Sequence, residues 1–174
     1  VNLFIPSTLN WTERAIRIEQ ITEFPKTDQT KLTVHGKGKF AINLRVPSWA
    51  TKGVQVKING KLESVNAEAG SYVKLARNWK EGDVIEWQLP FQFRLEPVMD
   101  QQNIASLFYG PILLAAQEPE ARKDWRPVTL NAQDISQSIQ GDPSQLKFQI
   151  DGIDFKPFYE SYGRHSVYLD VTLK

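Results

Sequence analysis

Residues 40–46 carry the pattern that most constrains the fold of this chain. Apolar residues occupy every even position, and Ala41, Asn43 and Arg45 occupy the odd ones. A period of two is typical of a β-strand with one face in a core, whereas the same residues in a helix would spread over all sides. Pro47 has no amide hydrogen to donate to a sheet, so we expect the strand to end there and Trp49 to lie in the turn that follows.

The same alternation recurs along the chain, with turn residues between the segments. Asn59-Gly60 favours the two positive-φ positions of a type I′ turn, which predicts a hairpin over residues 54–64. Many short strands with frequent turns indicate an all-β chain built from antiparallel, jelly-roll-like sandwiches. The other strands are expected at 3–5, 15–21, 32–35, 72–75, 84–89, 91–95, 104–109, 112–116, 146–150 and 165–173, and a single helical turn at 134–139.

A change of character at residues 96–100 predicts a boundary between two sandwiches in tandem. The sequence there reads Glu-Pro-Val-Met-Asp, and more apolar strands follow it. We therefore expect a first β-sandwich over 1–95 and a second over 96–174. A chain of 174 residues with 41% hydrophobic residues has enough apolar material for two small cores.

Charge and residue usage exclude several classes of function. Basic and acidic residues number 21 and 20, which argues against a nucleic-acid partner. The longest apolar run, residues 112–116, is far too short to span a membrane. The chain has no cysteine, so disulfides, thiolate nucleophiles and cysteine-bound zinc are excluded. Val1 and the strand-like residues after it indicate a piece of a longer protein.

Neither a catalytic residue nor a metal ligand is expected in this chain. His35 and His165 lie far apart in the sequence and have no companions at ligand spacing, so structural or surface roles are favoured. A glycosidase needs two carboxylates that face each other. Five acidic residues lie near turns, and the sequence gives no reason to pair any two of them: Glu96, Asp100, Asp151, Asp154 and Glu160.

Two tryptophans are candidates for carbohydrate binding. Exposed aromatic faces can stack on sugar rings, and Trp49 and Trp125 both lie in loops. Packing is the favoured alternative for both residues. Trp87 shares a face with Ile85 and Leu89 and is expected in the core, as is Trp79.

Eight segments, in order, resemble the C-terminal part of the β-L-arabinofuranosidase-like glycoside hydrolases of families 127 and 146. The resemblance covers nearly the whole chain, although His165 and Leu169 stand where the family tends to have tyrosine and tryptophan. The segments are Val-Asn-Leu-Phe-Ile-Pro-Ser (1–7), Leu-Arg-Val-Pro-Ser-Trp (44–49), Val-Lys-Ile-Asn-Gly-Lys (56–61), Gly-Ser-Tyr-Val (70–73), Trp-Lys-Glu-Gly-Asp-Val (79–84), Leu-Glu-Pro (95–97), Leu-Phe-Tyr-Gly-Pro-Ile-Leu-Leu-Ala (107–115) and Phe-Lys-Pro-Phe-Tyr (155–159).

The resemblance implies that this chain is the non-catalytic C-terminal β-sandwich portion of such an enzyme. In the family, an N-terminal (α/α)₆ barrel carries a zinc-bound cysteine nucleophile and a glutamate acid/base, and two β-sandwiches follow. The implied partners are the catalytic barrel of the same polypeptide and arabinose-containing glycans. Zinc would belong to that barrel, with no cofactor in this chain, and the parent would be periplasmic or extracellular.

Two alternatives stay open. One is an autonomous carbohydrate-binding module that uses Trp49 or Trp125. The other is an unrelated structural or interaction sandwich, because architecture alone does not fix function. If the chain supports a barrel, we expect an exposed apolar patch in the first sandwich, around residues 1–5 and 47–50.

Overall fold

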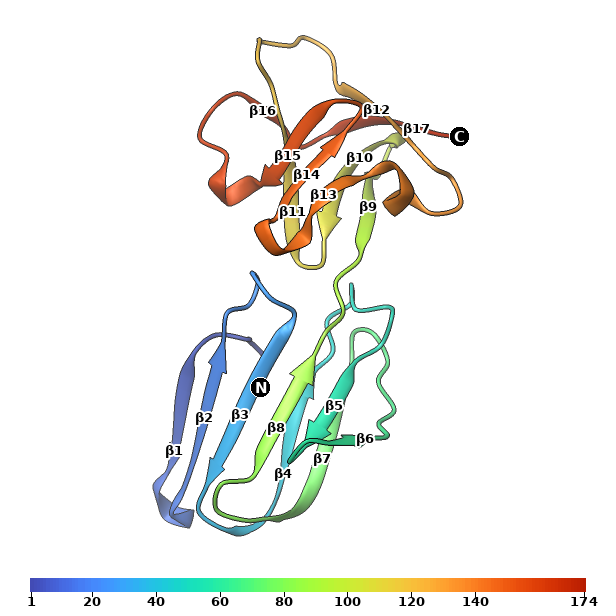
Figure 1. The fold of residues 1–174 in the computed structure, drawn as a ribbon. Helices are drawn as coiled ribbons and strands as arrows, with labels where there is room; N and C mark the ends of the chain where they lie inside the picture. Colours follow the sequence, from blue (N-terminus) through green and yellow to red (C-terminus); the bar gives the residue numbers. More distant parts are fainter. The chain divides into compact units, whose positions relative to one another are not determined.

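The computed structural model describes all residues 1–174 and divides the chain into two compact units, residues 1–90 and 91–174 (Figure 1). Both units consist of strands and short 3₁₀ turns, which confirms the all-β prediction. No helix in the chain has the length and apolar character needed to cross a bilayer.

The first unit is a sandwich of a six-stranded and a two-stranded antiparallel sheet. Buried residues of both sheets belong to one hydrophobic cluster, so the sheets pack face to face. The larger sheet has the order β1 (Ser7–Trp11), β2 (Ile16–Thr22), β3 (Gln29–His35), β8 (Val84–Gln88), β5 (Gln55–Ile58), β6 (Lys61–Glu63), and the smaller sheet pairs β4 (Gly38–Arg45) with β7 (Tyr72–Trp79).

Strand β4 follows the predicted alternation. Ile42 and Leu44 are buried, whereas Ala41, Asn43 and Arg45 are exposed. Ile42 and Leu44 face Leu75 and Val73 of β7 across the pair, so both strands present one apolar row to the core.

Two large tryptophans fill the first core, as predicted. Trp79 and Trp87 are completely or almost completely buried. The indole N–H of Trp79 donates a 3.1 Å hydrogen bond to the carbonyl of Phe40, which fixes the ring against β4.

The Asn59-Gly60 turn joins β5 to β6 and confirms the predicted hairpin. The φ angles are +53° at Asn59 and +77° at Gly60. The Asn59 carboxamide also donates to an Asp83 carboxylate oxygen at 2.9 Å and accepts from the Val84 N–H at 2.8 Å. The turn is therefore tied to the start of β8, a contact that the dipeptide signal does not predict.

The second unit is one sheet that curls around its own core. Strands near opposite ends of the sheet order supply one cluster, including Leu130 from β12 and Phe148 from β14. The order is β12 (Arg126–Leu130), β17 (Leu169–Leu173), β10 (Gln101–Tyr109), β11 (Ile112–Gln117), β15 (Ile153–Pro157), β14 (Lys147–Ile150), β13 (Gln140–Asp142); β9 (Phe93–Val98) also pairs with β10, and β16 (His165–Ser166) with β11.

The structure departs from the expected strands in several places. The single strand expected at 165–173 is two strands, β16 and β17, and β12, β13 and β15 were not among the predicted strands. Residues 3–5 are not a strand, because side-chain donors rather than a neighbouring strand take up carbonyls there; β1 begins at Ser7 instead. One pair, β12 with β17, is parallel rather than antiparallel. Glu96, the predicted start of the second sandwich, lies within β9, which pairs with β10 along its length.

Four short 3₁₀ turns complete the chain: η1 (Thr12–Arg14), η2 (Ile135–Ser138), η3 (Pro143–Gln145) and η4 (Phe158–Glu160). The second of these confirms the helical turn expected at 134–139. Asp134 caps it by accepting from the Ser136 N–H at 3.0 Å.

A buried ion pair links distant segments of the second unit. Glu118 follows β11 and accepts two hydrogen bonds from the Arg126 guanidinium, with side-chain exposures of 4% and 13%. The Ser166 hydroxyl donates to the same carboxylate at 2.8 Å. The Arg126 hydrogen bond holds the pKa of Glu118 below its ordinary 4.5, against the opposing effect of burial.

Asn59→Ala should lower the free energy of unfolding of the first unit by about 2–3 kcal/mol, because it removes two hydrogen bonds and replaces asparagine, which tolerates the left-handed region, by alanine, which does not. Gly60→Ala should cost about 1–2 kcal/mol through backbone strain alone. Gly60→Asn is the control, since asparagine tolerates positive φ. Chemical denaturation measures all three, and an unchanged midpoint for Asn59→Ala would contradict the hydrogen bonds to β8.

Glu118→Gln should destabilise the second unit by about 1–3 kcal/mol, between the costs for exposed and fully buried pairs, because it leaves the partly buried Arg126 charge without its counter-charge. Glu96→Gln is the matched control: it breaks the more exposed pair with Arg94, 2.7 Å away, and should cost at most about 1 kcal/mol. Because the folded pKa of Glu118 is depressed, its contribution is complete well above pH 4.5 and is lost as pH falls through the folded pKa. Denaturation at neutral and acidic pH should therefore bring Glu118→Gln and wild type closer together at low pH.

Candidate functional site

Trp49 packs rather than projects. It lies in the turn after β4, next to the buried Ala50, and its ring stacks on that of Phe24 with centroids 6.4 Å apart. Trp49 is partly buried against the core cluster of the first unit. Its position limits the ring face that a sugar could reach.

Trp125 is exposed. It immediately precedes β12 in the second unit and keeps 51% of its surface accessible. The ring of Tyr168 meets it nearly edge-on, with centroids 5.7 Å apart and planes inclined at 71°. Of the two predicted aromatic candidates, only Trp125 presents an open ring.

Several of the acidic residues near turns serve the fold. Glu96 pairs with Arg94 at 2.7 Å. Asp151 accepts the Thr129 N–H at 2.7 Å, and Asp154 accepts from Gln149 at 3.0 Å. These carboxylates hold strands and turns together and are not aimed at a common cavity.

The histidines have local partners. His35 lies 3.2 Å from a Glu81 carboxylate oxygen and 3.5 Å from one of Glu19. The hydrogen bond from the Gly36 N–H lowers the pKa of the Glu81 carboxyl below its ordinary value, and the hydrogen bond with His35 lowers it further. His165 lies 2.7 Å from the Gly163 carbonyl. No group of three or more histidine, cysteine or acidic side chains has an arrangement that could hold a metal ion.

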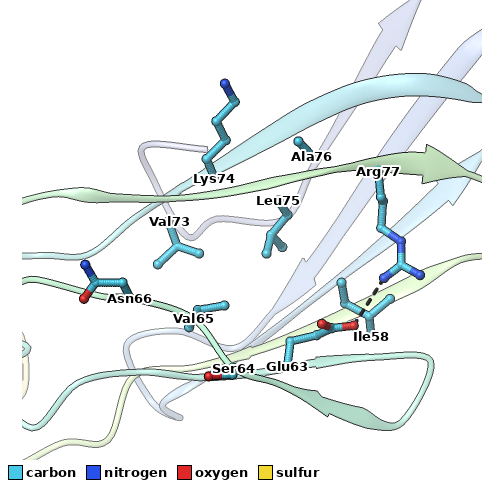
Figure 2. A pocket seen from close by; sticks show the side chains of 10 residues that line it. All are labelled: Ile58, Glu63, Ser64, Val65, Asn66, Val73, Lys74, Leu75, Ala76 and Arg77. Carbon is cyan, nitrogen blue, oxygen red and sulfur yellow. Dashed lines mark hydrogen bonds and ion pairs between the residues drawn. The ribbon is translucent and has the colours of Figure 1, made fainter.

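A cavity of about 620 Å³ opens at the β6–β7 side of the first unit (Figure 2). Val73 and Leu75 of β7 point into it toward Val65, whereas Lys74 projects from the other side of the strand. Its polar rim includes the ion pair of Glu63 and Arg77, 3.3 Å apart. One carboxylate held by an arginine does not make an acid/base pair, so this cavity is an open edge of the core.

A groove of about 550 Å³ opens near the N-terminal segment of the first unit. The segment bridges the two sheets: the Arg45 N–H in β4 donates to the Val1 carbonyl at 3.1 Å, and the Gln20 side chain in β2 donates to the Leu3 carbonyl at 3.0 Å. Phe4 of the segment is buried in the core, whereas its neighbours Leu3 and Ile5 point outward and stay exposed.

Three leucine and isoleucine side chains along this groove are more than half exposed. The values are 64% for Leu3, 54% for Ile5 and 57% for Leu9. The rings of Trp11 and Phe40 also line the groove, with their centroids 6.1 Å apart. The exposed apolar surface expected around residues 1–5 is therefore present, whereas at residues 47–50 Ala50 is buried and Trp49 is packed.

Sequence reasoning missed two of these features. Tyr168 was not connected to Trp125, because the parallel pairing of β12 with β17 that joins them spans more than forty residues. The position of Trp11 in the groove could not be predicted, because strand β1, which carries it, was not among the expected strands. The apolar residues at 3, 5 and 9 were the only local sign of the groove.

Comparison with known proteins agrees with this architecture. No curated protein sequence matches the chain. Among solved structures, one described as a glycoside hydrolase matches with a TM-score of 0.73 and 18% identity, over 95% of this chain and 34% of its own.

Two further solved structures match in the same way. Ara127N, a GH127 β-L-arabinofuranosidase from Geobacillus stearothermophilus T6, has a TM-score of 0.72 and 19% identity, over 98% of this chain and 33% of its own. Another GH127 β-arabinofuranosidase has a TM-score of 0.69 and 22% identity, over 96% of this chain and 33% of its own. At these identities the likeness shows the fold, and the chain spans about a third of the length of these proteins.

The sequence itself matches one family model. That model describes the middle domain of GH127 β-L-arabinofuranosidases, and the match covers residues 1–91 of the 174. The matched region coincides with the first unit and its six-on-two sandwich. Since the match takes in more than half of the chain, this protein belongs to the GH127 β-L-arabinofuranosidase family and carries its middle domain.

Proposed function

We propose that this chain is the non-catalytic β-sandwich portion of a β-L-arabinofuranosidase-like glycoside hydrolase, and that it supports a catalytic (α/α)₆ barrel of the same polypeptide. The observation that carries the proposal is the family match to a domain named as a middle one. The solved structures that resemble the chain are about three times its length, which leaves room for a separate catalytic domain.

The chemistry of the chain is consistent with a supporting role. The chain has no cysteine for the zinc-bound nucleophile that the family resemblance implies. Its histidine and acidic side chains do not gather into a ligand set, so its residues do not fit such a zinc. Catalytic groups and metal would therefore lie in the barrel.

The N-terminal groove is the surface that we assign to the barrel. Leu3, Ile5 and Leu9 expose their side chains together along one groove, whereas exposed apolar residues elsewhere on a soluble domain are usually scattered. They lie on the unit matched by the middle-domain model. An apolar surface of this kind favours burial against another folded domain, because each side chain removed from water contributes favourably.

The groove should bind a hydrophobic dye. Replacing Leu3 and Leu9 by serine should reduce dye fluorescence severalfold with little change in stability, because both side chains are exposed. Leu62→Ser is the matched control: Leu62 is 69% exposed but lies on β6, away from the groove. Equal losses from the two variants would contradict a specific apolar surface at the groove.

The isolated chain should not hydrolyse a nitrophenyl β-L-arabinofuranoside, with or without added zinc. The product of the complete reading frame that contains it should do so, because the proposal places the nucleophile and acid/base in an upstream helical domain. Turnover by the purified 174-residue chain above a buffer control, or a reading frame that encodes no such domain, would overturn the proposal.

A further inference from the structure

The second unit carries an aromatic corner, which we define as the facing rings of Trp125 and Tyr168. The two side chains remain 51% and 43% exposed. Their planes meet at 71°, with centroids 5.7 Å apart. Neither the indole N–H nor the phenol O–H donates a hydrogen bond within the protein, so both donors are available to a ligand beside two partly exposed rings.

The residues that directly follow the two rings are fixed in the sheet. Arg126 and Leu169, the residues directly after the two rings, are paired in the parallel ladder of β12 and β17. Leu169 is completely buried, and Arg126 is held by the buried carboxylate of Glu118. A ligand that binds the rings would therefore spend little free energy on ordering the protein.

The charges around the corner balance. Residues 118–126 contain three acidic and three basic side chains, and the central pair, Glu118 with Arg126, is internally neutralised. The exposed charges that precede Trp125 are Glu120, Arg122, Lys123 and Asp124. The stretch that leads into Trp125 therefore offers hydrogen-bond donors and acceptors without a net charge, which disfavours phosphates and uronic acids and suits an uncharged polyol.

We propose that the aromatic corner is a binding site for a neutral saccharide. A sugar ring has apolar C–H faces and a rim of hydroxyls, which matches one open ring face, a second ring at its side and two free donors. A lone flat ring would offer stacking only. This assignment does not depend on the function proposed for the parent enzyme, because it concerns only the second unit.

The chain contains a built-in probe for this site. It has five tryptophans, and Trp125 is the only one in the second unit. In a ¹⁵N-labelled sample, the five indole N–H signals can be followed separately, and Trp125→Phe identifies the relevant signal. We would titrate the 174-residue chain with arabinotriose, xylotriose and cellotriose, each in the millimolar range.

The Trp125 signal should shift saturably with at least one trisaccharide, with a Kd of about 1 mM, while the other four signals stay in place. Trp125→Ala and Tyr168→Ala should each weaken binding about tenfold, as measured from the shifts of backbone amide signals. Tyr168→Phe should lose only the hydroxyl's contribution and keep the affinity that ring stacking provides. Tyr162→Ala is the matched control, because Tyr162 is 93% exposed in the same unit.

Absence of a saturable Trp125 shift with all three sugars would overturn the assignment, as would an equal loss of binding in Tyr162→Ala. Retention of the native backbone spectrum by each variant excludes unfolding as the cause of any loss. A negative result would leave the assay of the complete reading frame unaffected, so failure here and failure of the proposed parent function are distinguishable.

Discussion

In the first unit a two-stranded sheet packs against a six-stranded sheet and is too narrow to cover it. The groove and the cavity of this unit follow from that difference in width. Neighbouring strands lie about 4.8 Å apart, so a six-stranded sheet is roughly 24 Å wide, far wider than a single pair. The β4–β7 pair covers the middle, where Trp87 and Leu32 are buried. The N-terminal segment and residues 63–67 extend the cover toward the two ends, and the groove and the cavity of Figure 2 open there.

Local patterns predicted the parts of the fold that local interactions determine. The alternation at residues 40–46 and the Asn59-Gly60 dipeptide are both found as expected, because side-chain period and backbone φ are properties of a few consecutive residues. Residues 3–5 look equally strand-like, yet the Gln20 side chain, distant in sequence, takes up the hydrogen-bonding groups there.

Contacts between distant segments limited what could be predicted of the sites. Trp125 was a candidate from its loop position alone, and its significance comes from Tyr168, which only the β12–β17 pairing brings beside it. Trp49 carried the same signal but meets Phe24 instead. The resemblance to GH127 enzymes came from ordered short segments, which identify a family without placing any ligand.

The groove and the aromatic corner differ in the chemistry that they present. The groove offers leucine and isoleucine side chains, flexible and without donors, which suit burial under another protein surface. The corner offers two stiff rings with free donors above a buried ion pair, which suits a small ring-shaped ligand. We therefore assign a structural role to one unit and a recognition role to the other.

The place of β17 in the sheet has a consequence for biosynthesis. β17 is the last strand of the chain, yet it lies between β12 and β10, both made earlier. A nascent second unit therefore waits with two apolar strand edges unpaired until residues 169–173 leave the ribosome, whereas every strand of the first unit has already been made by residue 88. During that interval the first unit can fold, whereas the second still exposes unpaired apolar strand edges of the kind that favour aggregation.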